Sequence, residues 1–325
     1  MTAVELVPRK RLELYSGRAH PSLAEEIAEH LGVKLGEPNL QEFANGEIHC
    51  RFGESVRGTD SFIVQTHCRP VNDSIMEQCI MIDAAKRASA KRITAVCPYY
   101  GYSRQDRKAE GREPITAKLV CDMLTVAGAD RIVSVDLHSG QIQGFFNGPV
   151  DHLTAMPVLV DYLARSVPDE LVVVAPDAGR VKVAERFAQH LDAELASVYK
   201  RRSGGLVRAL GVMGEEVVRG RHCVLIDDMI DTAGTIVAAA EVLLEYGARE
   251  VWAVATHGVL SDPAVDRLKN SSIAKVVVTN TLPLPAEKRI DKLEVLSVAE
   301  IVADAIDAVF EDTSVSDIFG GENQS

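Results

Sequence analysis

The stretch from Val224 to Thr235 combines paired carboxylates with a turn of small and hydroxyl residues. The apolar run Cys223 to Ile226 comes first and is typical of a strand in the middle of a parallel sheet. Asp227 and Asp228 follow at the expected carboxyl end of that strand, the edge where open α/β sheets bind ligands. Two adjacent carboxylates there can accept hydrogen bonds from the vicinal hydroxyls of a ribose.

A tight turn follows the two acids and opens the apolar-periodic segment Ile236 to Tyr246, which predicts a helix. Backbone N–H groups at a helix start, together with the helix dipole, form a phosphate site. Residues of this kind are also ordinary turn and cap residues, but two acids before the turn and Ala-Gly-Thr within it favour the functional interpretation. The turn consists of Asp231, Thr232, Ala233, Gly234 and Thr235, and with the acids it predicts a sugar-phosphate site.

A basic segment at 99–114 could meet further phosphates. It follows the apolar run Ile93 to Cys97, and its glycines and Pro114 predict a mobile loop able to close over a polyphosphate. Charge runs are more often solvated surface, but the neighbouring tyrosines and a helix pattern beginning at Pro114 favour a functional loop. Its cations are Arg104, Arg107, Lys108 and Arg112.

A second basic cluster, Lys200-Arg201-Arg202, follows the strand run Ala196 to Tyr199. It could donate to a triphosphate, although such a triplet at a strand end is usually a solvated edge.

Candidate metal ligands follow two further strand runs. His138 comes after Arg131 to Val135, and Asp177 comes after Leu171 to Ala175. A carboxylate beside phosphate oxygens suits an octahedral Mg²⁺ held chiefly by its nucleotide and by water, whereas histidine is an uncommon ligand for so hard a cation. From spacing alone, His138 is more often a hydrogen-bonded core residue.

The composition limits the classes of function. The chain has 325 residues, enough for about two domains, and its net charge of −12 argues against a general nucleic-acid or membrane-surface binder. The six cysteines show no C-x-x-C pairing, which predicts buried thiols in a reducing compartment. The sequence has neither a signal-peptide core nor a long apolar run, so we expect a cytoplasmic protein.

Strand-like and helix-like runs alternate along the chain, and this rhythm predicts an α/β fold with parallel sheets. Ser22, with Glu25 three places on, has the spacing of a helix-opening capping box. The segment ending at His138 aligns without a gap onto the segment ending at His257, which suggests two similar halves. We expect the join near 147–152, a turn-rich stretch.

Together these segments resemble the ribose-phosphate diphosphokinases, the class I, magnesium-dependent synthetases of 5-phosphoribosyl 1-diphosphate (PRPP), along nearly the whole chain. The resemblance rests on specific motifs: F-A-N-G-E at 43–47, Y-S-R-Q-D-R-K at 102–108, R-E-P-I-T-A-K-L at 112–119, D-L-H-S-G-Q-I-Q-G-F-F at 136–146, P-D-A-G at 176–179, K-R-R at 200–202, and the opening stretch.

The resemblance implies two phosphoribosyltransferase-like domains, each a mainly parallel sheet flanked by helices. They would span 1–150 and 151–307, with the tail from about 308 to 325 packing on the first and the ribose 5-phosphate motif in the second. The implied reaction moves the β,γ-diphosphoryl group of ATP to the 1-hydroxyl of ribose 5-phosphate, giving PRPP and AMP for nucleotide, histidine and tryptophan biosynthesis.

The resemblance also implies roles for residues. Phe43, Asn45, Gly46 and Glu47 would hold the adenine from a neighbouring subunit, and Arg104, Gln105 and Asp106 would help to bind ATP. His138 and Asp177 would bind Mg²⁺, as Mg-ATP plus a second ion. Lys200, Arg202 and Arg104 would be catalytic. Arg202, Asp227, Asp228 and Asp231 to Thr235 would bind ribose 5-phosphate.

Assembly and regulation are implied in the same way. The family forms a homohexamer built from dimers, activated by phosphate and inhibited by ADP between subunits. The matching positions are Ser55, Arg57, Ser89, Ser314 and Ser316. The chain departs from the family pattern at Glu110 in the mobile loop and at Asp317 in the tail. The family's loop closure and effector response therefore do not transfer directly to this chain.

Three other functions stay open. A phosphoribosyltransferase that consumes PRPP shares the acidic motif but needs neither F-A-N-G-E nor the R-Q-D-R-K loop. A non-catalytic regulatory subunit typically has an insertion in the catalytic loop or altered site residues, and this chain has neither. An α/β binding module without chemistry predicts no AMP formation.

Overall fold

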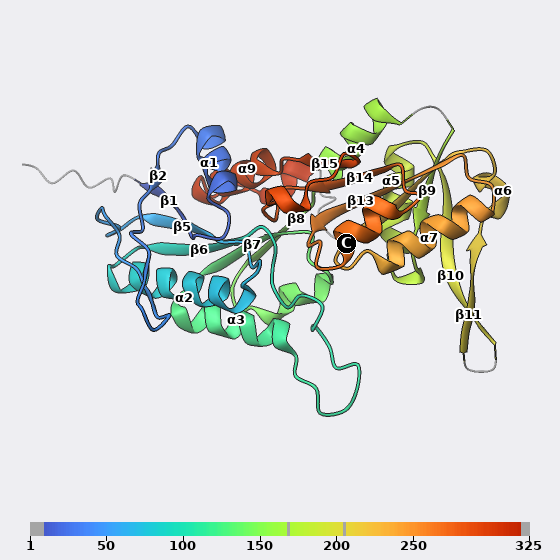
Figure 1. Ribbon diagram of the computed structural model, residues 1–325. Helices are drawn as coiled ribbons and strands as arrows, with labels where there is room; N and C mark the ends of the chain where they lie inside the picture. Colours follow the sequence, from blue (N-terminus) through green and yellow to red (C-terminus); the bar gives the residue numbers. More distant parts are fainter. Residues whose placement is uncertain (1–9, 168–169, 204–205, 320–325) are drawn as a thin grey trace, which may run out of the picture. The chain divides into compact units, whose positions relative to one another are not determined.

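The computed structural model describes residues 10–167, 170–203 and 206–319, and it divides into two compact units. Unit 1 comprises 10–153 together with 299–319, and unit 2 comprises 154–298. The C-terminal segment that belongs to unit 1 therefore begins at Ala299, before the expected residue 308. Each unit is a sheet flanked by helices, which confirms the predicted fold class (Figure 1).

Unit 1 is built on a six-stranded sheet in which every neighbouring pair is parallel. Because helices cover both sides of such a sheet, its strands are buried on both faces and are therefore apolar along their length. The strand order is β2 (Leu35–Gly36), β1 (Leu12–Ser16), β5 (Asp60–Val64), β6 (Arg92–Cys97), β7 (Arg131–Val135) and β8 (Val150–Leu153).

Helices cover the two faces of this sheet in pairs: α2 (Val71–Arg87) with α3 (Thr116–Ala127), and α1 (Pro21–Leu31) with α9 (Ala299–Phe310) on the opposite face (Figure 1). Alternate strand residues serve the two faces, so Ile63 and Ala95 pack in the cluster formed with α2 and α3. An antiparallel pair, β3 (Gln41–Glu42) and β4 (Ile48–His49), and two 3-10 turns, η1 (Gly140–Phe145) and η4 (Val315–Phe319), complete the unit.

The prediction that Ser22 opens the first helix was wrong. Helix α1 begins at Pro21, and its N-cap is His20, which makes no capping hydrogen bond. Proline is well suited to the first helical turn because its missing N–H has no intrahelical partner there. The Ser22 hydroxyl instead lies 3.2 Å from the Nδ1 atom of His20.

Unit 2 is built on a seven-stranded sheet that is parallel except for one edge hairpin. Lys200-Arg201-Arg202 lie within β10 and not after its end, because β10 continues to Ser203 by pairing with β11. The strand order is β11 (Leu206–Met213), β10 (Glu194–Ser203), β9 (Leu171–Ala175), β12 (His222–Ile230), β13 (Glu250–Gly258), β14 (Lys275–Thr279) and β15 (Leu293–Leu296).

Two long helices, one on each face, flank the middle of this sheet: α5 (Val181–His190), which contacts β9 and β12, and α7 (Gly234–Glu245), which contacts β12 and β13. Val172, Val174 and Leu225 form a buried cluster with α7 and α8 (Ala264–Asn270). Shorter elements complete the unit: α4 (Met156–Ser166), η2 (Ala178–Arg180), α6 (Glu215–Val218) and η3 (Ala286–Lys288).

The two sheets share one topology. In unit 1 the chain passes from β1 outwards to β2 and then returns to β5, so the direction of winding reverses between β1 and β5. In unit 2 it reverses in the same way between β9 and β12. By this order β5 corresponds to β12 and β6 to β13, so the aligned segments ending at His138 and His257 do not lie on equivalent strands. They share a helix end, a glycine with a positive φ and a strand, a combination common in α/β proteins.

The reversal in unit 1 is filled by its own polar side chains. Gln65, directly after β5, is 1% exposed and donates from Nε2 to Oε1 of Glu77 at 2.9 Å, while its Oε1 accepts from the backbone N–H of Ala19 at 3.2 Å. Glu77 is 3% exposed and pairs with Arg18, which follows β1. A Cβ atom on Gly17 would lie 2.3 Å from Oε1 of Gln65, so the backbone here closes directly onto the glutamine.

All six cysteines are free thiols. Four are buried as expected, but Cys50 and Cys68 are only half-buried. In the described parts of the chain, no helix has the length and apolar character needed to cross a bilayer.

Candidate active site

The reversal in unit 2 carries the predicted sugar-phosphate residues. Asp227 and Asp228 lie on β12, which extends through both acids to Ile230 because β13 continues to pair with it. The strand is therefore longer than the apolar run that predicted it. Strand ends beside such a reversal form the crevice where doubly wound sheets bind ligands.

Arg180 contacts both carboxylates. Its Nε lies 3.0 Å from Oδ1 of Asp227, and its Nη2 lies 2.6 Å from Oδ1 of Asp228. Burial raises the pKa of Asp227, the neighbouring Asp228 raises it further, and Arg180 opposes the rise. Arg180 was not among the residues predicted from the sequence.

The turn after β12 leads directly into α7. Ala233 is the N-cap residue with a left-handed φ of 60°, and α7 begins at Gly234, so neither Asp231 nor Thr232 is the N-cap. Thr232 is exposed, and its carbonyl accepts a hydrogen bond from Arg267 at 2.9 Å. The turn therefore presents the N-terminus of a twelve-residue helix beside the acid-bearing strand.

Asp177 follows β9, the neighbour of β12 in the sheet. Its side chain is exposed, and its Oδ1 accepts the backbone N–H of Gly179 at 2.8 Å. The Lys200 and Arg202 backbones pair with β11 at Leu210 and Val207, and their side chains lie outside the described residues.

In unit 1, the F-A-N-G-E residues form the turn of the β3–β4 hairpin. The Phe43 N–H donates to the Glu47 carbonyl at 2.8 Å, and Gly46 takes a left-handed φ of 88°. The side chain of Asn45 accepts the Glu47 N–H at 3.2 Å. Phe43 is 52% exposed, which leaves its ring open to a flat ligand.

The predicted mobile loop connects β6 to α3 without regular structure and projects from unit 1 (Figure 1). Arg104 and Gln105 are exposed, whereas Asp106 is only 8% exposed and accepts a hydrogen bond from Gln141 at 2.6 Å. The helix after the loop begins at Thr116, two residues beyond the expected Pro114. Asp106 therefore attaches the loop to the body of unit 1.

His138 lies in the turn after β7, half-buried. The preceding Leu137 donates its backbone N–H to Nε2 of His152 at 2.9 Å, which fixes this turn against β8. Across the described residues, no three His, Cys, Asp or Glu side chains gather as a metal site.

The residues matched to regulation all belong to unit 1. Ser55, Arg57 and Ser89 are exposed, and the Ser89 carbonyl accepts the backbone N–H of Gly58 at 2.8 Å, so these segments are adjacent. Ser314 is exposed and Ser316 is half-buried in η4.

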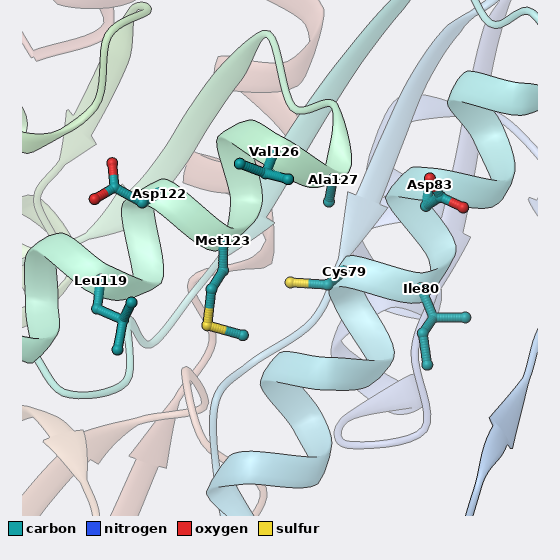
Figure 2. Close-up of a pocket in the computed structure, with 8 residues that line it drawn as sticks. All are labelled: Cys79, Ile80, Asp83, Leu119, Asp122, Met123, Val126 and Ala127. Atoms are coloured by element: carbon teal, nitrogen blue, oxygen red, sulfur yellow. The ribbon is translucent and has the colours of Figure 1, made fainter.

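A separate hollow of about 550 Å³ lies between α2 and α3 of unit 1 (Figure 2). Cys79 and Met123 face it, and its acidic members, Asp83 and Asp122, provide no counter-charge for phosphate. It contains none of the predicted site residues. The hollow is lined by Cys79, Ile80, Asp83, Leu119, Asp122, Met123, Val126 and Ala127.

Comparisons with known proteins show which family the chain resembles. Residues 12–128 match the N-terminal domain of ribose phosphate pyrophosphokinase, and residues 208–320 match the phosphoribosyl synthetase-associated domain. The ribose-phosphate pyrophosphokinase of Streptomyces avermitilis is 55% identical over 98% of this chain and 99% of its own length. That of Bifidobacterium longum is 57% identical over 96% and 93%.

A solved structure gives the same result. The phosphoribosylpyrophosphate synthetase of Mycobacterium smegmatis superposes with a TM-score of 0.89 at 54% identity, covering 93% of this chain and all of that one. With this fold, these motifs and this identity over nearly its full length, the chain belongs to the ribose-phosphate pyrophosphokinase family.

Proposed function

We propose that the protein transfers the β,γ-diphosphoryl group of ATP to the 1-hydroxyl of ribose 5-phosphate, forming PRPP and AMP. The observation that carries this proposal is the reversal of unit 2, where Asp227 and Asp228 lie beside the turn that opens α7. The carboxylates would accept the ribose hydroxyls, and the N–H groups of Asp231 to Thr235 would hold the 5-phosphate.

ATP would bind through unit 1 residues. The exposed Phe43 ring offers a stacking surface for adenine, with Asn45, Gly46 and Glu47 shaping the hairpin turn beneath it. Arg104 and Gln105 are exposed on the loop and would reach the nucleotide. Asp106 would serve ATP binding by holding the loop in place through Gln141.

In the transfer step, the 1-hydroxyl oxygen forms a bond to the β-phosphorus while the bond from that phosphorus to the AMP oxygen breaks. The hydroxyl proton passes to water. Positioning and cations do most of the work in such reactions because negative charge spreads over the non-bridging oxygens. We assign that stabilisation to Lys200, Arg202 and Arg104, with Arg202 also contacting ribose 5-phosphate.

Mg²⁺ is the proposed metal, as Mg-ATP with a second ion. When bound, it would neutralise the negative charge of the phosphates. The exposed Asp177 carboxylate fits a hard cation well, whereas His138 fits it less well and would act beside water and phosphate ligands.

Regulation and assembly are further parts of the proposal. Phosphate and ADP would act as effectors through Ser55, Arg57, Ser89, Ser314 and Ser316, and the adjacency of the Arg57 and Ser89 segments supports a shared site. We propose a homohexamer of dimers, in which Phe43 serves a neighbouring subunit, and a cytoplasmic location, which suits six free thiols.

Purified protein incubated with ATP, ribose 5-phosphate and magnesium tests the reaction. Separation of the nucleotides should give AMP in equal amount to PRPP, with no AMP when ribose 5-phosphate is omitted. ADP as the product would indicate an ordinary kinase, and an unchanged nucleotide pool would indicate a binding protein.

A further inference from the structure

One guanidinium bridges the two acids of the sugar site. The Nε atom of Arg180 lies 3.0 Å from Oδ1 of Asp227, and its Nη2 atom lies 2.6 Å from Oδ1 of Asp228. The contact is well shielded, since the side chain of Arg180 is 15% exposed and those of the two acids are 19% and 8% exposed. It is therefore unlike the solvent-exposed ion pairs that contribute little.

The backbone places Arg180 opposite the acids. Arg180 ends η2 and caps α5. Its N–H donates to the Asp177 carbonyl at 3.2 Å, which gives a tight turn directly after β9. Because β9 and β12 are neighbours at the reversal, this turn directs the guanidinium across the strand ends toward the acids.

The two carboxylates need a cation to stay charged together. Asp227 and Asp228 are adjacent in sequence, and burial and mutual repulsion favour a shared proton. Within the described chain, the charged groups that act on Asp227 are Asp228 on the same strand and Arg180 from η2, while its partner on β13 is the uncharged Ala255. A protonated pair would offer fewer acceptors to a diol.

We propose that Arg180 is a positioning residue for ribose 5-phosphate, which aligns Asp227 and Asp228 for the sugar hydroxyls and favours their ionised forms. It engages one oxygen of each carboxylate, and each carboxylate carries a second acceptor oxygen. This inference rests on the proposed function. If Arg180 instead competed with the sugar for the two carboxylates, its removal would raise the affinity for ribose 5-phosphate, which is the opposite change.

The test compares R180Q and R180K with the wild type by AMP formation, with each substrate varied in turn. R180Q should raise the KM for ribose 5-phosphate about tenfold at neutral pH, as expected for roughly one unit of pKa. That increase should shrink toward about pH 9, where the acids ionise without help. The KM for ATP and the kcat at saturating ribose 5-phosphate should stay within about twofold of the wild type, because Arg180 acts on ground-state sugar binding.

R180K should give an intermediate KM, because an ammonium is a point charge that cannot span two carboxylates as a guanidinium does. The matched control is R165Q, which removes an exposed arginine–aspartate pair on α4 of the same unit, with side chains 71% and 65% exposed. It should leave all kinetic constants and their pH dependence unchanged.

A KM for ribose 5-phosphate in R180Q that is unchanged, lowered, or raised equally at every pH would overturn the role of Arg180. If R180Q does not fold, the KM of R180K for ribose 5-phosphate and its dependence on pH are compared with those of the wild type instead. Failure of the wild-type protein to form AMP would reject the proposed function itself, which is a different outcome from an active R180Q enzyme with wild-type affinity.

Discussion

The Nδ1 atom of His67 accepts a hydrogen bond from the backbone N–H of Gly101 at 3.0 Å. Because Nδ1 is an acceptor, the ring proton is on Nε2, which lies 2.8 Å from Oε1 of Gln78 and donates to it. Gln78 in turn donates to the carbonyls of Ile63 on β5 and Val96 on β6. The first residues of the Arg104 loop are thereby tied to the sheet through a buried imidazole.

His67→Ala should loosen this loop. The change leaves Gln78 and the Gly101 N–H without their buried partner, so the free energy of unfolding should fall by about 2–4 kcal/mol. Trypsin should cut the folded protein faster at the loop cations, and turnover should fall about tenfold because Arg104 is less well positioned. The exposed His30→Ala on α1 serves as the control. Cleavage at the wild-type rate would show that the loop does not depend on His67.

The same histidine should make the protein sensitive to acid. Burial lowers the pKa of His67 to about 4, from an ordinary 6.5. Between these values the unfolded chain binds a proton that the folded protein does not, so stability falls as pH falls. The loss between pH 7 and pH 5 should be about 2 kcal/mol.

Urea unfolding at the two pH values measures this loss. His67→Asn, whose carbonyl can still accept the Gly101 N–H, should show a smaller decrease than the wild type. Equal decreases in both proteins would mean that folding does not lower the pKa of His67.

Lys200→Ala should lower turnover far more than it lowers affinity for ribose 5-phosphate. If Lys200 stabilises charge that develops on the transferring phosphoryl group, kcat should fall by roughly a hundredfold or more with little change in KM. Lys269→Ala, an exposed lysine on α8, is the control. If steady-state kinetics gave an unaltered kcat, Lys200 would not have the proposed catalytic role.

Ala233 should tolerate glycine but not valine. Its φ of 60° is a left-handed conformation that is strained for β-branched residues, and its side chain is 5% exposed. Ala233→Val should cost about 2 kcal/mol or more through strain and overpacking, whereas Ala233→Gly should stay within about 1 kcal/mol because relief of strain offsets the lost methyl group. Thermal unfolding of both variants checks this. A valine variant as stable as the wild type would show that the turn can change its conformation.

The strands that the sequence predicted best are buried on both faces. Arg131 to Val135 and Leu171 to Ala175 have the predicted bounds, and the apolar run Ile93 to Cys97 lies within β6, because an apolar run is itself the signature of a central parallel strand. Strands β10 and β12 extend beyond their apolar runs, because backbone pairing with β11 and β13 continues through charged residues.

The candidate site could be recognised in the sequence where its residues are contiguous. Asp227 to Thr235 form one strand, turn and helix start, so their spacing alone indicated a sugar phosphate. Arg180 and His67 were missed because their partners are distant in sequence, and only the strand order brings them together. Asp106 lies in a polar loop, and its burial against Gln141 depends on tertiary packing.

The shared topology makes Gln65 the counterpart of the acid pair on β12. In unit 2 the strand carries two carboxylates paired with Arg180, whereas in unit 1 glutamine, glutamate and arginine satisfy one another at the corresponding place. In the described part of unit 1, these side chains occupy the position that corresponds to the acid pair. If the hairpin tip and the long loop of unit 1 bind ATP as proposed, one architecture used twice serves two different substrates through different parts of its surface.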